Sequence, residues 1–354
     1  MILPSLSSRS LLATALLAGA FDSSNSLVSA APDDRLANTR GIVRCGVENI
    51  PAPELLKMEE EFKSHRMALE EGGRGGGGGS GGGGSSLSDP LSVDVYLHII
   101  AANDTAEGGN VLGTQIEDQM GVLNVDYQTM NIDFKLKNVT RTVRPEWFNV
   151  KPNSKEQADM KHSLRQGGPA DLNVYLGCLD PPGLLGYSTF PRDVHENPGD
   201  DGVVVLFSSL PGGAAEPYNE GKTLTHEVGH WLGLYHTFQG GCDEPGDFVD
   251  DTPAEARPGF GCPEGRKSCK RSTGLDPIHN YMDYGDDSCL SSFTQGQAVR
   301  ARDQIAIYRG IKGSKQGGSS SGGGGGGGGG KQHTGRPGRY YHDRRSSFER
   351  HGLH

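Results

Sequence analysis

Three histidines and one glutamate within eleven residues have the spacing of a catalytic zinc site. His226 and His230 are four residues apart, so on an α-helix they project from one face and can bind one cation through ring nitrogens. Glu227 lies beside that metal and can take a proton from a water that the metal polarises. Gly233 lets the chain leave the helix, which returns His236 as a third ligand. Three nitrogen ligands with one open position predict a catalytic zinc site.

A methionine motif follows about fifty residues downstream, where residues 280–284 read Asn-Tyr-Met-Asp-Tyr. This motif resembles the Met-turn of the metzincin zinc proteases. The resemblance implies that Met282 forms an apolar floor beneath the metal and that Tyr284 reaches toward the zinc. The alternative is that Met282 is an ordinary core methionine at a tight turn. Since a bare His-Glu-x-x-His pair is only moderately specific, the third histidine and this turn favour a true zinc site.

The segments around these motifs are similar to the pappalysin family, especially to its secreted fungal extracellular metalloproteases. The matching stretches are residues 236–242, 246–253, 261–263, 276–284 and 293–297. The likeness covers roughly residues 90–311. It implies a zinc endopeptidase with two disulfides after the active-site helix and, in some members, bound calcium.

Four of the six cysteines lie close together in sequence around the methionine motif. Cys242, Cys262, Cys269 and Cys289 permit three pairings. The family resemblance implies Cys242 with Cys269 and Cys262 with Cys289. Such bridges would stabilise a segment rich in Gly, Pro and Asp, by about 2–4 kcal/mol each.

The two remaining cysteines leave alternatives open. The run Arg44-Cys45-Gly46-Val47 resembles the cysteine switch of zinc-protease propeptides, in which a thiolate occupies the fourth metal position and keeps water out. The competing interpretation is a Cys45–Cys178 disulfide that ties the N-terminal segment to the catalytic domain, and this disulfide is slightly favoured. A free thiol is the third alternative.

The pattern of apolar residues predicts an α+β fold. Val93, Val95, Leu97 and Ile99 alternate with polar residues, as in a half-buried strand. Further strands are expected at 132–143, 171–178 and 202–208, and helices at 110–127 and 155–165. If residues 31–71 are a retained arm rather than a propeptide, a short helix is expected around residues 54–70. Strands that alternate with helices indicate a twisted mixed sheet with helices above the active-site helix. The resemblance implies a metzincin-like zinc-protease domain, followed by a disulfide-stapled C-terminal subdomain that contains the Met-turn.

Three further elements would complete the site. Residues 184–191 look like the edge strand of the cleft, where an extended substrate pairs its backbone. The alternative is an ordinary edge strand without a role in substrate binding. Residues 222–234 would form the helix that carries the first two histidines. Thr294 and Gln297 predict a capping box, with Phe293 packed against Ala298, for a last helix to about residue 311.

Two Gly/Ser tracts divide the 354-residue chain. The predicted segments are a signal peptide (1–30), an extension or propeptide (31–71), a linker (72–89), the catalytic domain (90–315), a second linker (316–330) and a basic disordered tail (331–354). The signal's apolar stretch, eleven residues long, is too short to span a bilayer, which predicts a secreted, extracellular protein without a membrane anchor. Asn103 and Asn138 stand in candidate glycosylation sequons, unless these are unused surface loops.

Charge gives further expectations about ligands. A formal net charge of −10 gives no reason to expect nucleic-acid binding. Asp247, Asp250, Asp251 and Thr252 form an acidic loop that is either a candidate calcium site or a solvated turn. The basic tail is most simply a solvated appendage; binding to anionic wall polymers or metal is the alternative.

These observations predict a secreted zinc endopeptidase that hydrolyses peptide bonds of extracellular proteins, with Glu227 as general base and Tyr284 near the oxyanion. The preference for peptides over other acyl substrates rests on the family resemblance and on the expected edge strand. The alternative is a secreted, non-catalytic zinc-containing protein that attaches to polyanionic surfaces through its basic tail. The presence of Glu227 favours the enzyme, because a binding protein does not need the base.

Overall fold

The computed structural model describes residues 41–47, 50–73, 87–243 and 245–313. The predicted signal peptide, most of the first linker, the second linker and the basic tail lie outside the described residues. The helices are α1 (Ala52–Gly73), α2 (Gly113–Asp126), α3 (Pro145–Phe148), α4 (Lys155–Leu164), α5 (Asp193–Glu196), α6 (Lys222–Trp231) and α7 (Gln295–Tyr308). The strands are β1 (Leu91–Ala101), β2 (Ile132–Val143), β3 (Asn149–Val150), β4 (Leu172–Leu179), β5 (Gly186–Ser188) and β6 (Val203–Leu206).

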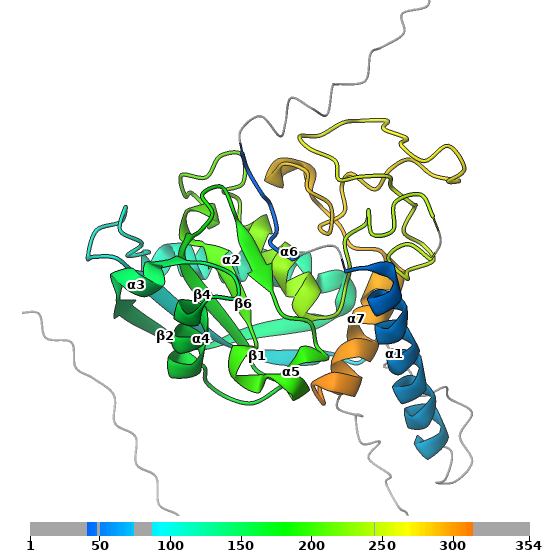
Figure 1. Ribbon diagram of the computed structural model, residues 1–354, viewed down its shortest axis with the longest axis horizontal. Coiled ribbons are helices and arrows are strands. Elements are labelled where there is room, and N and C mark those ends of the chain that lie inside the picture. The colour runs from blue at the N-terminus through cyan, green and yellow to red at the C-terminus, as the bar shows by residue number, and fades with distance from the viewer. Residues whose placement is uncertain (1–40, 48–49, 74–86, 244, 314–354) are drawn as a thin grey trace, which may run out of the picture. The chain divides into compact units, whose positions relative to one another are not determined.

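The sheet is mixed, as predicted. Its strand order is β2-β1-β4-β6-β5, and β3 pairs with the end of β4 (Figure 1). The pairs β1–β2, β1–β4 and β4–β6 are parallel, whereas β5 runs antiparallel to β6 at one edge. The expected edge strand is therefore present, with its paired residues at 186–188.

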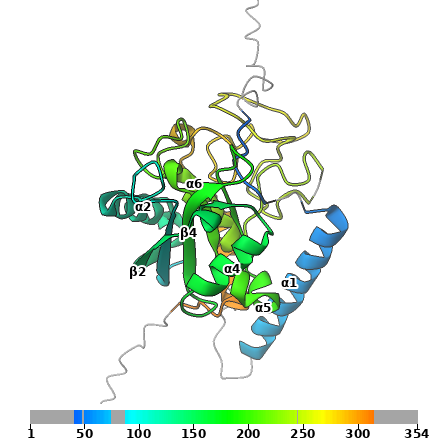
Figure 2. The ribbon, with the colours of Figure 1, turned by 60° about the vertical axis from the view of Figure 1, so that its left-hand side comes forward.

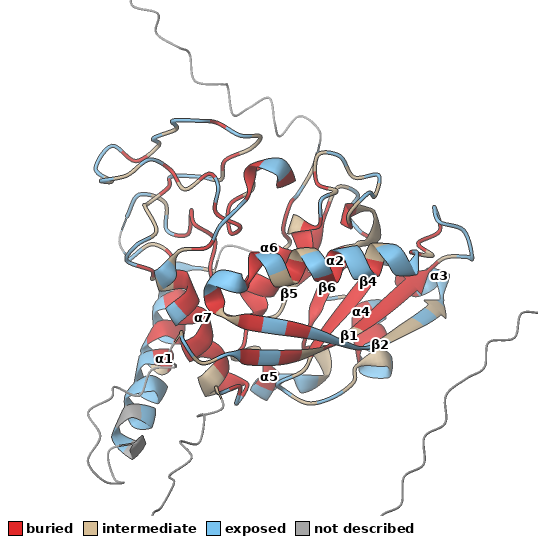
Figure 3. Cartoon of the chain, turned by 180° about the vertical axis from the view of Figure 1, so that it is seen from behind, coloured by how far each residue is buried: buried red, intermediate tan, exposed pale blue. Residues whose placement is uncertain are grey.

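Both faces of the central strands are covered, which explains their nearly continuous apolar sequence. Leu172, Val174 and Leu176 of β4 pack in the core that also contains side chains of α2, α6 and α7. Tyr175 points to the opposite face and packs in a second core with Met160 of α4 and side chains of α3. Figure 3 shows this burial along the inner strands and the greater exposure of the outer strand β2.

The expected helices form close to their predicted bounds, because local signals define them. Thr294 and Gln297 make the predicted capping box at the start of α7: the threonine hydroxyl accepts from Gln297 N at 3.0 Å, and the glutamine side chain accepts from Thr294 N at 2.9 Å. Helix α1 lies alongside α7 (Figure 1), and Figure 2 shows α1 at the edge of the described part of the chain. No helix among the described residues is long and apolar enough to cross a bilayer.

The segment between α6 and α7 has little regular structure, and disulfides cross-link it. Disulfides join Cys242 to Cys269 and Cys262 to Cys289, which are the pairs that the family resemblance implies. The Cys262–Cys289 bridge spans residues 280–284, and the Cys242–Cys269 bridge joins two positions in the segment before them. The subdomain after the active-site helix is therefore disulfide-stapled, as expected.

Candidate active site

Helix α6 and the turn that follows it position the three histidines. His226, Glu227 and His230 are fully buried on α6. The helix ends at Trp231, earlier than predicted, because Gly233 takes a left-handed conformation (φ +97°). Gly233 N donates to His230 O at 2.8 Å, and the next amide donates to the carbonyl of residue 229 at 2.9 Å. This glycine-terminated turn redirects the chain so that His236 faces the helix.

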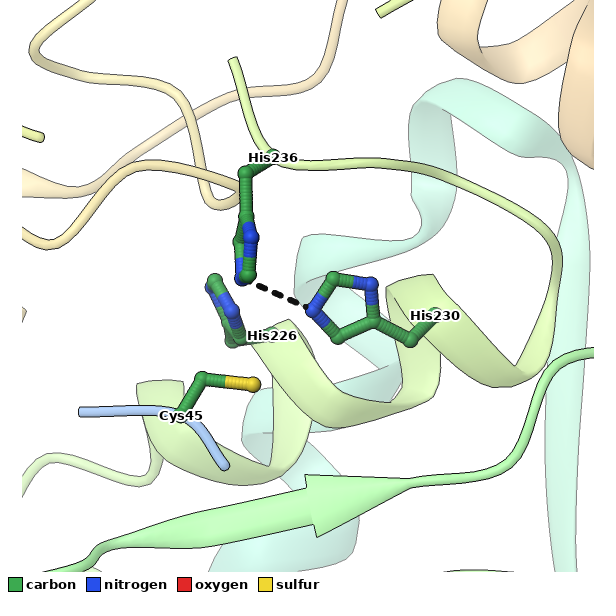
Figure 4. A group of neighbouring side chains, drawn as sticks. All are labelled: Cys45, His226, His230 and His236. Atoms are coloured by element: carbon green, nitrogen blue, oxygen red, sulfur yellow. Dashed lines mark hydrogen bonds between the residues drawn. The ribbon is translucent and has the colours of Figure 1, made fainter. Parts of the chain in front are cut away.

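The three imidazoles each direct one ring nitrogen toward a common point (Figure 4). The Nδ1 atom of His226 lies 2.7 Å from Tyr281 O, and that of His230 lies 2.8 Å from Leu234 O. A carbonyl can only accept, so these Nδ1 atoms carry the protons and the Nε2 atoms carry lone pairs. His226 Nε2 has no hydrogen-bond partner in the described part of the chain, and the Nε2 atoms of His230 and His236 are 3.1 Å apart.

This donor set fits a zinc ion. Two nitrogens bound to one tetrahedral zinc at about 2.0–2.1 Å lie about 3.3 Å apart, close to the separation seen between His230 and His236. Burial lowers the pKa of all three imidazoles, that of His230 to about 4, which favours the neutral, metal-binding form. The carbonyls that accept from Nδ1 fix the ring orientations.

The Glu227 carboxyl group is buried beside the histidines with one oxygen unsatisfied. Burial raises the pKa of Glu227 to about 8, and its Oε1 has no hydrogen-bond partner among the described residues. A Cβ at Gly186 would lie 2.9 Å from this oxygen, so the glycine of the edge strand leaves room for the carboxyl group. Gly186 was not singled out from the sequence, although a glycine inside a strand is a known sign of close approach.

The methionine motif lies beneath α6. Met282 is fully buried, and a Cβ at Gly229 of the helix would collide with its sulfur. Asn280 Oδ1 accepts from Met282 N at 3.0 Å and holds the turn. The hydroxyl of Tyr284 is 3.3 Å from His236 Nε2, so this tyrosine lies beside the histidine cluster.

A buried aspartate joins the metal helix to this turn. Asp126, at the end of α2, accepts from Lys222 Nζ at 2.8 Å, from Thr225 Oγ1 at 2.7 Å and from Tyr281 OH at 2.8 Å. Tyr281 in turn supplies the carbonyl that holds His226. Sequence reasoning missed Asp126, because its partners are distant in sequence and no motif contains it.

The N-terminal segment pairs along the expected edge strand, at the place where the sequence predicts the substrate cleft. Val43 N donates to Gly183 O at 2.8 Å, Leu185 N donates to Val43 O at 3.0 Å, and Gly46 N donates to Gly186 O at 2.8 Å. These bonds direct the Cys45 side chain toward the three imidazoles (Figure 4). The cysteine sulfur and one nitrogen from each histidine lie within 4.8 Å of one another.

Arg44, the residue before Cys45, also holds this segment in place, through an ion pair. Its guanidinium pairs with Asp287 Oδ1 at 2.9 Å, and both side chains are almost fully buried. Asp287 Oδ2 accepts from the backbone amides of Glu220 and Lys222, so it also caps the start of α6. This partner was not predicted from the sequence, because 243 positions separate Arg44 from Asp287.

The favoured Cys45–Cys178 disulfide is wrong. Both cysteines are free; Cys45 is buried at the histidines, while Cys178 lies half-buried on β4. Cys178 packs against the core on the far face of the sheet, whereas backbone pairing with Gly183 and Gly186 carries Cys45 across the cleft. The sequence does not show whether the thiols of Cys45 and Cys178 lie close together. In the structure they lie in different parts of the fold, so they do not form a disulfide.

The remaining candidate residues lie away from the histidines. Asp250 and Asp251 are exposed, and Asp251 Oδ2 accepts from Gly296 N at 2.9 Å. Asp247 is buried and accepts from Val249 N at 3.1 Å. The sequon asparagines are both exposed: Asn103 accepts from the amide and hydroxyl of Thr105, and Asn138 donates to Gln166. Calcium binding and glycosylation therefore stay predictions.

Taken with the sheet, the histidine cluster and the methionine turn define a metzincin-like zinc metallopeptidase. The sequence profile of Peptidase_M43, described as pregnancy-associated plasma protein-A, matches residues 189–306. Extracellular metalloprotease 1 of Coccidioides posadasii is 42% identical over 292 residues, which cover 81% of this chain and 95% of that protein. An extracellular metalloprotease of Pyricularia oryzae is 47% identical over 223 residues, covering 63% and 77%.

Solved structures agree with this assignment. Mirolysin, determined with a bound compound, is 30% identical with a TM-score of 0.55, covering 62% of this chain and 92% of that one. A promirolysin variant from Tannerella forsythia is 26% identical with a TM-score of 0.58, covering 75% and 94%. The chain belongs to the M43 (pappalysin) family and is an extracellular zinc metalloprotease. This confirms the predicted enzyme rather than the binding protein, and proteins are its substrates.

Proposed function

We propose that His226, His230 and His236 hold the zinc ion and that Glu227 is the general base of peptide-bond hydrolysis. The observation that carries this proposal is the buried carboxyl group of Glu227, with one free oxygen, beside three imidazoles whose Nε2 atoms converge. When bound, zinc supplies a Lewis acid that polarises a water molecule and the scissile carbonyl. Glu227 then takes a proton from the attacking water and passes it to the leaving amine. Burial raises the pKa of Glu227, which makes its carboxylate a stronger base.

Tyr284 is proposed to stabilise the developing oxyanion. Its hydroxyl lies at the metal side of His236, at 3.3 Å from Nε2, and can donate a hydrogen bond to an oxygen held there. Burial raises the pKa of this phenol well above its usual value, so the hydroxyl keeps its proton for this role.

The substrate is proposed to bind as an extended strand. The backbone groups of Gly183, Leu185 and Gly186 already pair with the N-terminal segment in the cleft. The same donors and acceptors are suitable for the backbone of a peptide that replaces this segment. Recognition through the backbone supports proteins as substrates without requiring a particular side chain at each position.

The extension 31–71 is proposed to act as a propeptide, with Cys45 as its inhibitory group. Cys45 Sγ lies at the open position of the histidine cluster, and its bond to Glu227 covers the base. The ion pair between Arg44 and Asp287 holds the cysteine in place. Promirolysin covers 75% of this chain, against 62% for mirolysin, and this larger share supports the presence of a propeptide.

The experiment that tests the catalytic assignment is replacement of Glu227 by Gln in the processed protein. We expect turnover of a peptide library to fall by about 10²–10⁴-fold, while zinc content measured by atomic spectroscopy stays near that of the parent. Glu220→Gln is the matched control, since Glu220 is an exposed glutamate just before the same helix. Undiminished turnover of the Glu227→Gln protein would refute the assignment.

The acidic loop is proposed to bind calcium as a structural ion. Asp247 Oδ2 and Thr252 Oγ1 are buried oxygens, and both residues line a cavity of about 140 Å³. Calcium should raise the melting temperature of the parent but not of Asp247→Asn. An equal effect on both proteins would exclude this site.

A further inference from the structure

Helix α1 has a contact surface of its own, separate from the cleft segment. Leu55, Met58, Glu59 and Phe62 are its buried side chains. Their spacing places them on one face of the helix. This face meets α7 (Figure 1), and the other sides of the helix are exposed.

A buried ion pair forms the centre of this contact. Arg300 of α7 donates to Glu59 at 3.0 Å and 2.5 Å through its two terminal nitrogens, in a bidentate pair. Tyr235 OH donates to the same carboxylate at 2.9 Å. Only 4% of the Glu59 side chain and 6% of the Arg300 side chain are exposed. Glu59 of α1 therefore neutralises the positive charge of Arg300, which is buried in the catalytic domain.

Apolar and aromatic side chains surround the pair. Leu55 packs in a cluster with Phe190 and Tyr235, and the rings of Phe62 and Tyr308 stack at 6.4 Å. The Arg300 guanidinium lies 4.7 Å from the centroid of the Tyr235 ring. We name Phe190, Tyr235, Arg300 and Tyr308 the α1 socket.

The α1 socket also contacts the turn between His230 and His236. Arg300 Nε donates to Gly233 O at 2.9 Å, and Gly233 is the residue that redirects the chain between His230 and His236. The N-terminal segment is thus held twice: at the cleft through Arg44 and Cys45, and at the back of the metal turn through α1.

We propose that α1 is a docking helix that stays bound to the α1 socket after the chain is cut downstream of it, so that cutting alone does not free the active site. Only four residues, 48–51, connect Val47 to the start of α1. While α1 is docked, this short connection keeps Cys45 at a high effective concentration at the histidines. Release of Glu59 from Arg300 is then the step that activates the enzyme. The inference rests on the proposed latency, but its binding test needs no activity.

The test uses the full-length chain with a site-specific protease sequence inserted after Ser80. After cutting, native size-exclusion chromatography measures whether the N-terminal fragment elutes with the catalytic domain, and a peptide assay measures activity. We expect the parent to retain the fragment and stay latent. In Glu59→Gln the fragment should bind at least about tenfold more weakly, and activity should appear on cutting.

Glu60→Gln is the matched control, because Glu60 is the neighbouring, exposed glutamate on the same helix. It should retain the fragment as the parent does. Thermal unfolding of the uncut Glu59→Gln chain verifies that it is folded. Loss of the fragment from the cut parent, or equal retention by Glu59→Gln and the parent, would overturn the proposal. If a cut Cys45→Ser chain retains the fragment but is no more active than the cut parent, docking is supported and the proposed latency is wrong.

Discussion

The thiol of Cys45 donates to the carboxylate of Glu227 across 3.4 Å, although 182 positions separate these residues in the sequence. The contact joins the N-terminal segment to the candidate general base at the centre of the histidine cluster. Burial, followed by the neighbouring Glu227, raises the pKa of the Cys45 thiol. A zinc ion bound at the histidines would favour the thiolate instead. One side chain therefore reaches both the candidate metal position and the candidate base.

Replacing Cys45 by Ser should give a chain that is active without removal of its N-terminal segment. A hydroxyl is a much weaker zinc ligand than a thiolate, so a substrate would displace it more readily. We expect about a tenfold or greater rise in peptide cleavage by the full-length protein, measured before any processing.

Cys178→Ser is the control for this change, because Cys178 is the other free cysteine and lies on β4. It should remain as latent as the parent. Equal latency of the Cys45→Ser protein and the parent would exclude the cysteine as the inhibitory group.

Replacing Gly186 by Ala should damage catalysis while leaving zinc in place. The added Cβ would lie 2.8 Å from Glu227 Cγ and 2.9 Å from Oε1, so the carboxyl group must shift. A displacement of that kind costs up to about 10²-fold in turnover. Steady-state kinetics and zinc content of the processed protein test the prediction.

Gly121→Ala serves as its control, since no atom lies within 4 Å of a Cβ built at that helical position. It should leave turnover unchanged. Normal turnover in Gly186→Ala would show that catalysis does not depend on the present position of the Glu227 carboxyl group.

Replacing Asp126 by Asn should weaken zinc binding without touching a ligand. Asp126 ties Lys222 and Thr225 of α6 to Tyr281, whose carbonyl orients His226. Loss of such a support commonly costs about 10–100-fold in metal affinity. Competition with a chromogenic chelator measures this change.

The control is Asp133→Asn, an exposed aspartate with a 3.7 Å contact to Lys135. Such a surface pair contributes little, so this variant should bind zinc as the parent does. Unchanged zinc affinity in Asp126→Asn would show that the tie is not needed to orient His226.

Local patterns predicted the elements and the histidine cluster. The four-residue spacing of His226 and His230, the turn at Gly233 and the capping box of Thr294 and Gln297 each depend on residues a few positions apart. The alternating pattern of β1 predicted a strand for the same reason. Such features are determined within one turn or one strand, so a sequence can reveal them.

Long-range partners could not be predicted in this way. Arg44 and Asp287 are 243 positions apart, and Glu59 and Arg300 are 241 positions apart. Each is an ordinary charged residue until the fold buries it against its partner. The choice between a disulfide and a metal-facing thiol at Cys45 failed for the same reason, because both alternatives are consistent with the sequence and only the packing of the N-terminal segment distinguishes them.

The most direct test of the account is zinc-edge X-ray absorption of the full-length protein beside its Cys45→Ser variant. The account predicts one sulfur scatterer at about 2.3 Å in the parent, together with nitrogen ligands, and no sulfur in the variant. Spectra that are the same in both proteins would contradict the proposal that Cys45 and the three histidines share one zinc ion.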